Sequence, residues 1–223
     1  MLEILDGEVL GIVALTIRMT LLSTTISALL GIPLGLWLDS AHFPGKGAVV
    51  AINRALMASP PVVVGLVVYL ILMRNGPLGF LRLLFTFEAM VIAQVLLITP
   101  IICGIVHTAS QRSSQRIRLF ALTMGASKSQ TRRLLVKELG NEIFFAALTG
   151  YGRAMSEVGA IMIVGGNIRH HTRTMTTSIS LLRNRGEIEQ ALTLGVLLMI
   201  IALAVQALGN FVRKREARTD ENF

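Results

Sequence analysis

The chain has 223 residues, of which 53% are apolar and only 15% charged, and it carries a net charge of +8. This composition excludes a disordered chain and argues against an ordinary soluble domain. It also argues against a nucleic-acid-binding protein, because aromatic residues make up only 5% of the chain and long apolar runs interrupt the bases. The single cysteine, Cys103, excludes an intrachain disulfide and a CxxC site.

Five stretches of the sequence are long and apolar enough to cross a membrane as helices. A bilayer core of about 30 Å requires roughly 20 mainly apolar helical residues. We therefore predict an all-α integral membrane protein with about five transmembrane helices and a multi-pass location. The expected spans are residues 15–38, 55–73, 89–108, 143–165 and 190–212. The first eight residues contain acids and no base, which predicts a retained N-terminus rather than a cleaved signal peptide.

The basic residues are distributed unevenly between the two sides that these spans define. One side holds most of them, namely Lys46, Arg54, the bases from Arg112 to Lys137 and those from Arg213 to Arg218. The other side holds Arg74, Arg82, Arg169, Arg173, Arg183 and Arg185. The positive-inside rule then predicts a cytoplasmic C-terminus and an outside N-terminus. The expected division is an external segment (1–14), a transmembrane region (15–212) and a basic cytoplasmic tail (213–223).

The long cytoplasmic connection, residues 109–142, has helical periodicity rather than the composition of a linker. Apolar residues recur at i, i+3, i+4 and i+7 over 117–124, and a helical pattern resumes over 132–139. Gly125, Ala126 and Ser127 separate the two patterns, and Ser127 is a candidate N-cap of the second helix. Two interpretations stay open, an amphipathic helix lying on anionic lipid and a docking helix for a cytoplasmic partner.

The segment from Leu119 to Ser127 resembles the cytoplasmic EAA loop of ABC importer permeases, whose pattern is EAAxxxG followed by a further helical stretch. The match lies in its second half, since Leu119 and Phe120 stand where the family has Glu and the first Ala. By this resemblance the loop contacts a separate ATP-hydrolysing subunit. The residues implied in this contact are Leu119, Phe120, Ala121, Gly125, Ala126, Ser127 and Lys128.

Two further segments resemble the oxyanion branch of these permeases, which handles sulfate, molybdate and tungstate. They are SPPVVVGL at 59–66 and GRAMSEVG at 152–159, which leads into GGNI at 165–168. With RNGPLG at 74–79, the nearest resemblance is to tungstate-specific permeases. It implies a type I ABC importer permease fold in the cell (inner) membrane, a homodimer lining one pathway, two ATPase subunits and an external tungstate-binding protein.

Pro60 and Pro61 predict a break in the second span. Neither can donate a backbone hydrogen bond, so the helix must kink or end around residues 58–61. Broken backbone in a membrane needs protein or water beside it. The break therefore either faces a central pathway, where Ser59 and free backbone groups meet a hydrated anion, or is a packing kink between spans.

Arg153 and Glu157 are four residues apart and are expected on one face of the fourth span, near its middle. An unpaired charge at that depth costs roughly 2.5 to 3.5 kcal/mol, so the two should pair. One hypothesis is that the pair changes partners between inward-facing and outward-facing states and exposes a positive group to the anion. The alternative is a static structural clamp.

The segment 167–189 is expected outside, and Arg169, His170 and Arg173 form a basic rim on it. Such a rim would attract a divalent oxyanion and an acidic surface of a binding protein, whereas the plainer interpretation is a solvated loop. His170 and His171 lack a third ligand at a suitable spacing, so no metal site is expected.

Several sequence patterns of enzymes are absent. No GxxxxGK[ST] pattern occurs, so this chain should not hydrolyse ATP, and neither GxSxG nor HExxH occurs. We expect no catalytic residues and no cofactor bound by this chain, with ATP used by the partner ATPase. The expected function is a tungstate importer permease. The alternatives are molybdate or sulfate import, a passive anion channel, and a membrane-embedded regulatory subunit.

Overall fold

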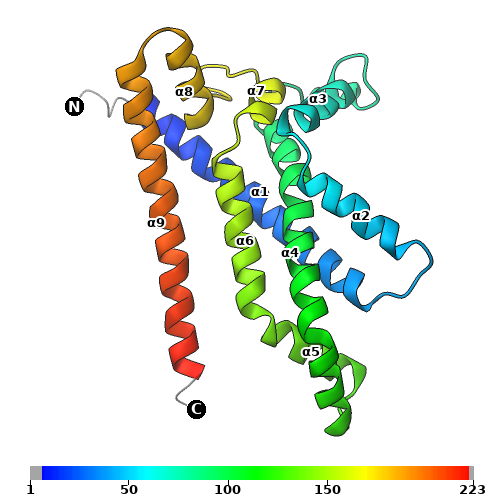
Figure 1. The fold of residues 1–223 in the computed structure, drawn as a ribbon. Coiled ribbons are helices and arrows are strands. Elements are labelled where there is room, and N and C mark those ends of the chain that lie inside the picture. The colour runs from blue at the N-terminus through cyan, green and yellow to red at the C-terminus, as the bar shows by residue number, and fades with distance from the viewer. Residues whose placement is uncertain (1–6, 221–223) are drawn as a thin grey trace.

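The computed structural model describes residues 7–220, with side chains described through Gly209 and at Phe211. All regular elements in this part of the chain are helices, as the sequence predicts (Figure 1). In chain order they are α1 (Gly7–Ser40), α2 (Lys46–Met57), α3 (Pro61–Leu72), the short 3-10 helix η2 (Gly79–Leu81), α4 (Phe87–Thr123), α5 (Lys128–Glu138), α6 (Gly140–Met155), α7 (Gly159–Gly165), α8 (Met175–Asn184) and α9 (Ile188–Asp220).

Three of the described helices are individually long and apolar enough to cross a membrane. They are α1, α4 and the part of α9 from Ile188 to Gly209. The helices α2 and α3 meet the same criterion as a pair, bent by 103°. The break that Pro60 and Pro61 predict is confirmed, because α2 ends at Met57 and α3 begins at Pro61.

The structure corrects the expectation of one continuous helix over residues 143–165. Here α6 ends at Met155 and α7 begins at Gly159, so Glu157 lies between the two helices. The physical reason is that side chains form hydrogen bonds with backbone groups that would pair with other backbone groups in a continuous helix. The Glu157 carboxylate accepts from the N–H of Ala160 at 3.0 Å, and the Thr176 hydroxyl donates to the Glu157 carbonyl at 2.8 Å. The expected pairing of Arg153 with Glu157 is confirmed, at a distance of 2.7 Å.

The crossing of α1 and α4 holds the centre of the molecule together. An ideal Cβ built on Gly35 would lie 2.7 Å from the backbone oxygen of Cys103, and one on Gly31 would lie 3.0 Å from that of Thr99. The two backbones therefore touch, which van der Waals packing inside a membrane favours at small residues. Beside this crossing, α3 and α7 pack on α4 around a buried cluster that includes Met90.

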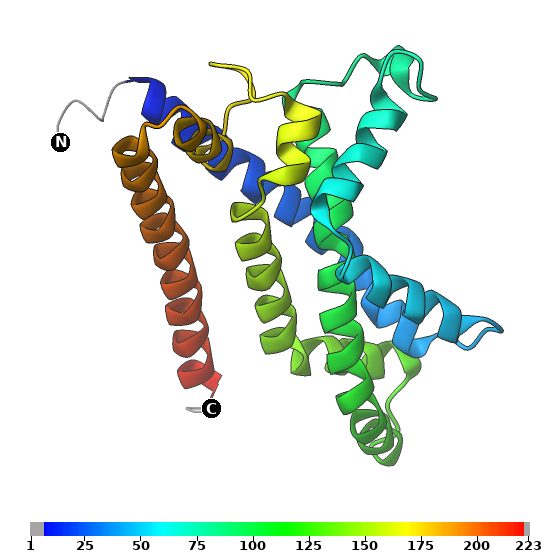
Figure 2. The ribbon, with the colours of Figure 1, turned by 45° about the horizontal axis from the view of Figure 1, so that its top comes forward.

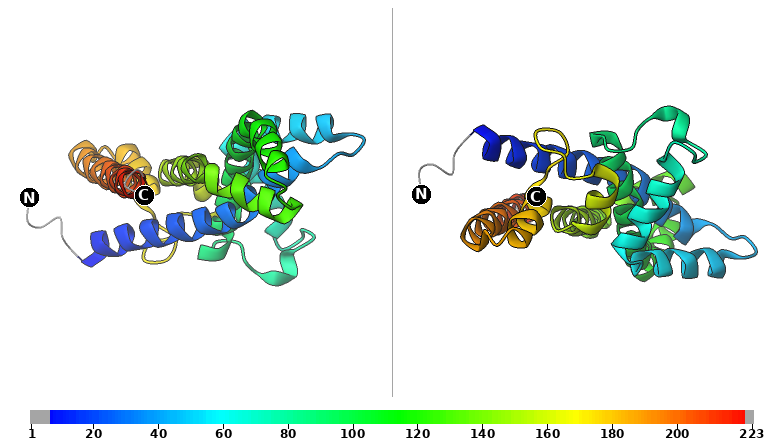
Figure 3. Two further views of the ribbon diagram at one scale, coloured as in Figure 1. Left: turned by 90° about the horizontal axis from the view of Figure 1, so that it is seen from below. Right: turned by 90° about the horizontal axis from the view of Figure 1, so that it is seen from above.

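The start of α1 and the end of α9 lie at opposite ends of the molecule, and α5 lies at the same end as the end of α9 (Figure 1). Viewed along this axis, α9 and α2 occupy opposite edges, with α6 and α4 between them (Figure 3). Of the expected tail, residues 213–220 continue α9. Residues 221–223 of that tail and 1–6 of the expected external segment lie outside the described residues.

We predict that Gly35→Ala lowers the stability of the protein by about 1 to 3 kcal/mol, because the added methyl group would force α1 away from the α4 backbone. Gly11→Ala is the matched control, since nothing lies within 4 Å of a Cβ at that position of α1. Thermal unfolding in detergent measures both variants. Equal midpoints for the two would show that the helices can separate at no cost.

Candidate functional site

Two helix breaks lie beside each other because α3 packs against α7 (Figure 2). An ideal Cβ on Gly65 would lie 2.6 Å from the Cα of Ala160, and one on Gly159 would lie 2.8 Å from a methyl carbon of Val62. We call residues 58–60 and 156–158, which precede these two helices, the paired break. The structure thus brings together the two segments from which the sequence analysis selected pathway residues.

Glu157 is the most constrained charge at the paired break. Its side chain is only 3% exposed, and one carboxylate oxygen lies 2.7 Å from Nη1 of Arg153 while the other accepts from the N–H of Ala160. The Arg153 side chain is 32% exposed, and Nη1 makes the only hydrogen bond of its guanidinium with the described residues. Arg153 therefore keeps N–H groups that could donate hydrogen bonds to an anion. Each carboxylate oxygen of Glu157 already accepts a hydrogen bond within the chain.

Ser59 lies just after the end of α2 and forms a hydrogen bond with its last turn. Its hydroxyl donates to the carbonyl of Leu56 at 2.7 Å, and the carbonyl of Pro60 accepts from the N–H groups of Val63 and Val64. The Ser59 proton is thus used within the chain and is not directed at a ligand. The nitrogens of Pro60 and Pro61 carry no hydrogen, so they donate no hydrogen bond at this break.

Gln94 is a site residue that the sequence analysis did not select. It is fully buried in α4, accepts from the Ser23 hydroxyl at 2.6 Å and donates to the carbonyl of Ala154 at 3.0 Å. These bonds join α1, α4 and the last turn of α6. The available signal was a lone amide inside an apolar span, since intramembrane polar side chains are expected to bind a partner.

The turn between α4 and α5 confirms that Ser127 is an N-cap. Its hydroxyl accepts from the N–H of Gln130, and the Gln130 side chain accepts from the N–H of Ser127 at 2.7 Å. Gly125 has a φ of 66°, which favours glycine. Of the implied contact residues, Ala121 is 1% exposed and is covered by the chain itself, and Ala126 is partly covered, while the remainder are exposed.

Large apolar side chains project around this turn. We name the set the apolar tip, and its members are Leu119, Phe120, Leu122 and Met124, which are 58% to 72% exposed. The sequence analysis selected the first two but not Leu122 and Met124. An apolar surface at the end of a long helix, followed by the basic helix α5, is suited to contact with another protein.

The basic rim is partly neutralised by Glu8. Arg169 donates to both carboxylate oxygens of Glu8, and Nη1 of Arg173 lies 3.6 Å from one of them. The hydrogen bond with Glu8 raises the pKa of the Arg169 guanidinium above its ordinary value. His170 is exposed, and no group of three metal-ligating side chains occurs among the side chains that the structure describes, those of residues 7–209 and 211. The rim borders a cavity of about 590 Å³ between α1, α8 and α9.

Comparison with known proteins gives several full-length relatives. The chain is 42% identical to the tungstate uptake system permease protein TupB of Peptoclostridium acidaminophilum, over 91% of this chain and 89% of that one. It is 40% identical to a probable anion ABC transporter permease protein of Haloferax volcanii, over 92% and 90% of the two chains. Permeases named for molybdenum and sulfate transport are less similar, at 29% and 27% identity.

The fold also matches a solved structure, described as an amino acid ABC transporter with histidines, with a TM-score of 0.71 over 92% of each chain and 17% identity. This match supports the expected type I permease fold. The family model for the binding-protein-dependent transport system inner membrane component covers residues 31–218. The chain therefore belongs to this family of ABC transporter permeases.

Proposed function

We propose that the chain is the membrane-spanning permease of an ATP-driven importer for tungstate. The observation that carries this proposal is the near full-length similarity to a tungstate permease, which exceeds the similarity to the molybdenum and sulfate permeases. Delivery by an external tungstate-binding protein and energy from two separate ATPase subunits are part of the proposal.

Two copies of the chain would line one pathway in the inner membrane. The helix α9 supports this, because only 11% of its most apolar stretch is buried within the chain, so lipid or a second copy must cover the rest. We propose that a second copy of the chain packs against part of this exposed face of α9. Because each chain crosses the membrane only a few times, one subunit has too few helices to enclose a complete pathway.

The paired break is the proposed anion contact within this pathway. Arg153 would present its remaining N–H donors to the oxyanion, and the positive end of the α3 backbone would add to the attraction. Glu157 holds Arg153 in place in this conformation. An exchange of this partner between inward-facing and outward-facing states is the proposed switch.

The apolar tip and the start of α5 are the proposed contact with the ATPase. Closure of two ATPase subunits would move the two apolar tips toward each other, and α6 would carry this movement to the paired break. The basic rim of Arg169, His170 and Arg173 is the proposed contact for the binding protein.

Uptake into proteoliposomes tests the function directly. The vesicles contain this chain and its ATPase, the binding protein is added outside, and tungstate, molybdate and sulfate are offered with and without internal ATP. We expect tungstate uptake that requires both ATP and the binding protein. Preference for another anion would correct the substrate, and flux without ATP would instead indicate a passive channel.

Arg153→Gln tests the anion contact. We expect tungstate uptake to fall about 10- to 100-fold, because hydrogen bonds to a charged group contribute roughly 1.5 to 3 kcal/mol. Uptake is normalised to the amount of assembled complex, and Arg183→Gln, which removes an exposed base of α8 outside the paired break, is the control. Unchanged uptake by an intact Arg153→Gln complex would leave the pair with a purely structural role.

Leu122→Asp tests the ATPase contact. The leucine is 72% exposed at the apolar tip, and a charge there should raise the dissociation constant of the permease and ATPase at least about tenfold. Binding is measured with purified subunits, and Gln115→Asp on the exposed side of α4 is the control. Equal binding by both variants would place the ATPase contact elsewhere.

A further inference from the structure

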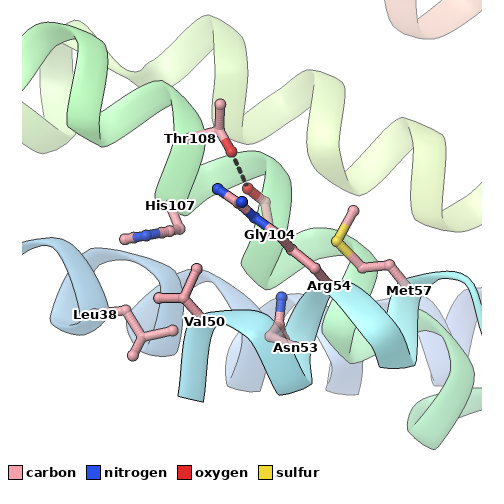
Figure 4. A pocket seen from close by; sticks show the side chains of 8 residues that line it. All are labelled: Leu38, Val50, Asn53, Arg54, Met57, Gly104, His107 and Thr108. Atoms are coloured by element: carbon pink, nitrogen blue, oxygen red, sulfur yellow. Dashed lines mark hydrogen bonds between the residues drawn. The ribbon is translucent and has the colours of Figure 1, made fainter. Parts of the chain in front are cut away.

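A small polar pocket lies between the end of α1, the helix α2 and the helix α4 (Figure 4). Its volume is about 130 Å³. The side chains of Asn53 and Arg54 extend toward it from α2, and His107 and Thr108 border it from α4. Nothing in the proposed transport function uses these four side chains together.

The pocket contains one positive charge and one buried imidazole that lack partners in the described part of the chain. Arg54 is exposed and takes part in none of the ion pairs found among residues 7–209 and 211, whose side chains are described. The His107 side chain is 4% exposed, and neither ring nitrogen has a hydrogen-bond partner. A buried polar group without a partner is unfavourable, so a ligand or water is expected to complete this site.

The other two polar side chains are fixed to the pocket wall. The Asn53 amide donates to the carbonyl of Pro100 at 3.1 Å, and the Thr108 hydroxyl donates to the carbonyl of Gly104 at 2.8 Å. The first bond anchors α2 to α4 beside Arg54, and the second lies within α4. The acid Asp39 forms its ion pair with Arg118 rather than with Arg54, and its Oδ2 also accepts from the Ser110 hydroxyl.

The depth of the pocket matches the level of lipid headgroups. With a rise of about 1.5 Å per residue, Gly104 and Thr108 lie roughly 26 and 32 Å along α4 from Phe87. A hydrocarbon core of about 30 Å that begins near the start of α4 therefore ends at this pocket. Phospholipid phosphates lie just beyond that boundary.

The outer surface of α2 suits an acyl chain. Val49, Ile52 and Leu56 follow one another along one face of the helix and are 40% to 60% exposed. Asn53, Arg54 and Met57 lie on the adjacent face, which borders the pocket. One molecule with a charged oxyanion head and an apolar tail could contact both faces at once.

We propose that this pocket binds a tetrahedral oxyanion, and that its occupant is the phosphate of an anionic phospholipid. A free oxyanion would meet the same Arg54 and His107 groups, but it would not use the apolar face of α2. Basic pockets between helices at the cytoplasmic boundary of a membrane are suited to such headgroups. The lipid would tie α2 to α4 just above the helical extension that carries the apolar tip.

Native mass spectrometry of the purified full-length protein tests the proposal. The protein is incubated in detergent with an equimolar mixture of phosphatidylglycerol and phosphatidylethanolamine. We expect preferential retention of phosphatidylglycerol, reduced about fivefold by Arg54→Gln, since one base near an anionic headgroup contributes on this scale. Arg133→Gln, which removes an exposed base at the same end, should leave retention unchanged.

A second pocket variant and a phosphate titration complete the test. Thr108→Val preserves the side-chain shape and serves as a second pocket variant if Arg54→Gln does not elute as folded protein. Titration of lipid-depleted protein with inorganic phosphate distinguishes the sources. Phosphate binding that depends on Arg54, without lipid preference, would support the oxyanion site and replace its occupant with a free anion. Lipid retention and phosphate binding that are both independent of Arg54 would overturn the proposal.

Discussion

Backbone polar groups inside a bilayer must find partners within the protein, because lipid cannot form hydrogen bonds with them. Two breaks in the helices create such groups, and side chains satisfy several of them. Ser59 donates to the end of α2, Gln94 donates to the end of α6, and Glu157 accepts from the start of α7. Thr176 then donates to the carbonyl of Glu157. These side chains thus provide hydrogen-bond partners for backbone groups next to the paired break, which is the proposed anion contact.

The charge distribution shows where attraction for an anion can arise. The bases expected on the outer side are matched by as many acids, namely Glu3, Asp6, Glu8, Glu88, Glu187 and Glu189. The net charge of +8 therefore belongs mainly to the opposite end, which holds α5 and the turn between α4 and α5. Long-range attraction at the outer surface is weak on this account, which favours the proposed delivery by a binding protein and the proposed short-range contact with Arg153 over electrostatic steering.

Local signals in the sequence predicted part of this structure well. Proline marks the end of α2, and Ser127 with Gln130 marks the start of α5, because in both cases the cause lies within a few residues. The break after α6 was not predicted, since Glu157 depends on Thr176 and the end of α6 depends on Gln94 from another helix. The pairing of Glu8 with Arg169 spans 161 residues, which no local pattern contains.

The helix α6 gives the proposed coupling a physical route. The helix α5 ends at Glu138 and α6 begins at Gly140, so the single residue Leu139 separates them and no flexible linker does. The 16 residues of α6 extend roughly 24 Å as a rigid element and end beside Arg153 and the paired break. A shift of α5 by a docked partner would therefore move the end of α6 against Gln94, which is held by α1 and α4. The hydrogen bonds around Glu157 are the contacts that such a shift must rearrange, which makes the end of α6 the point where the two states of the permease would differ.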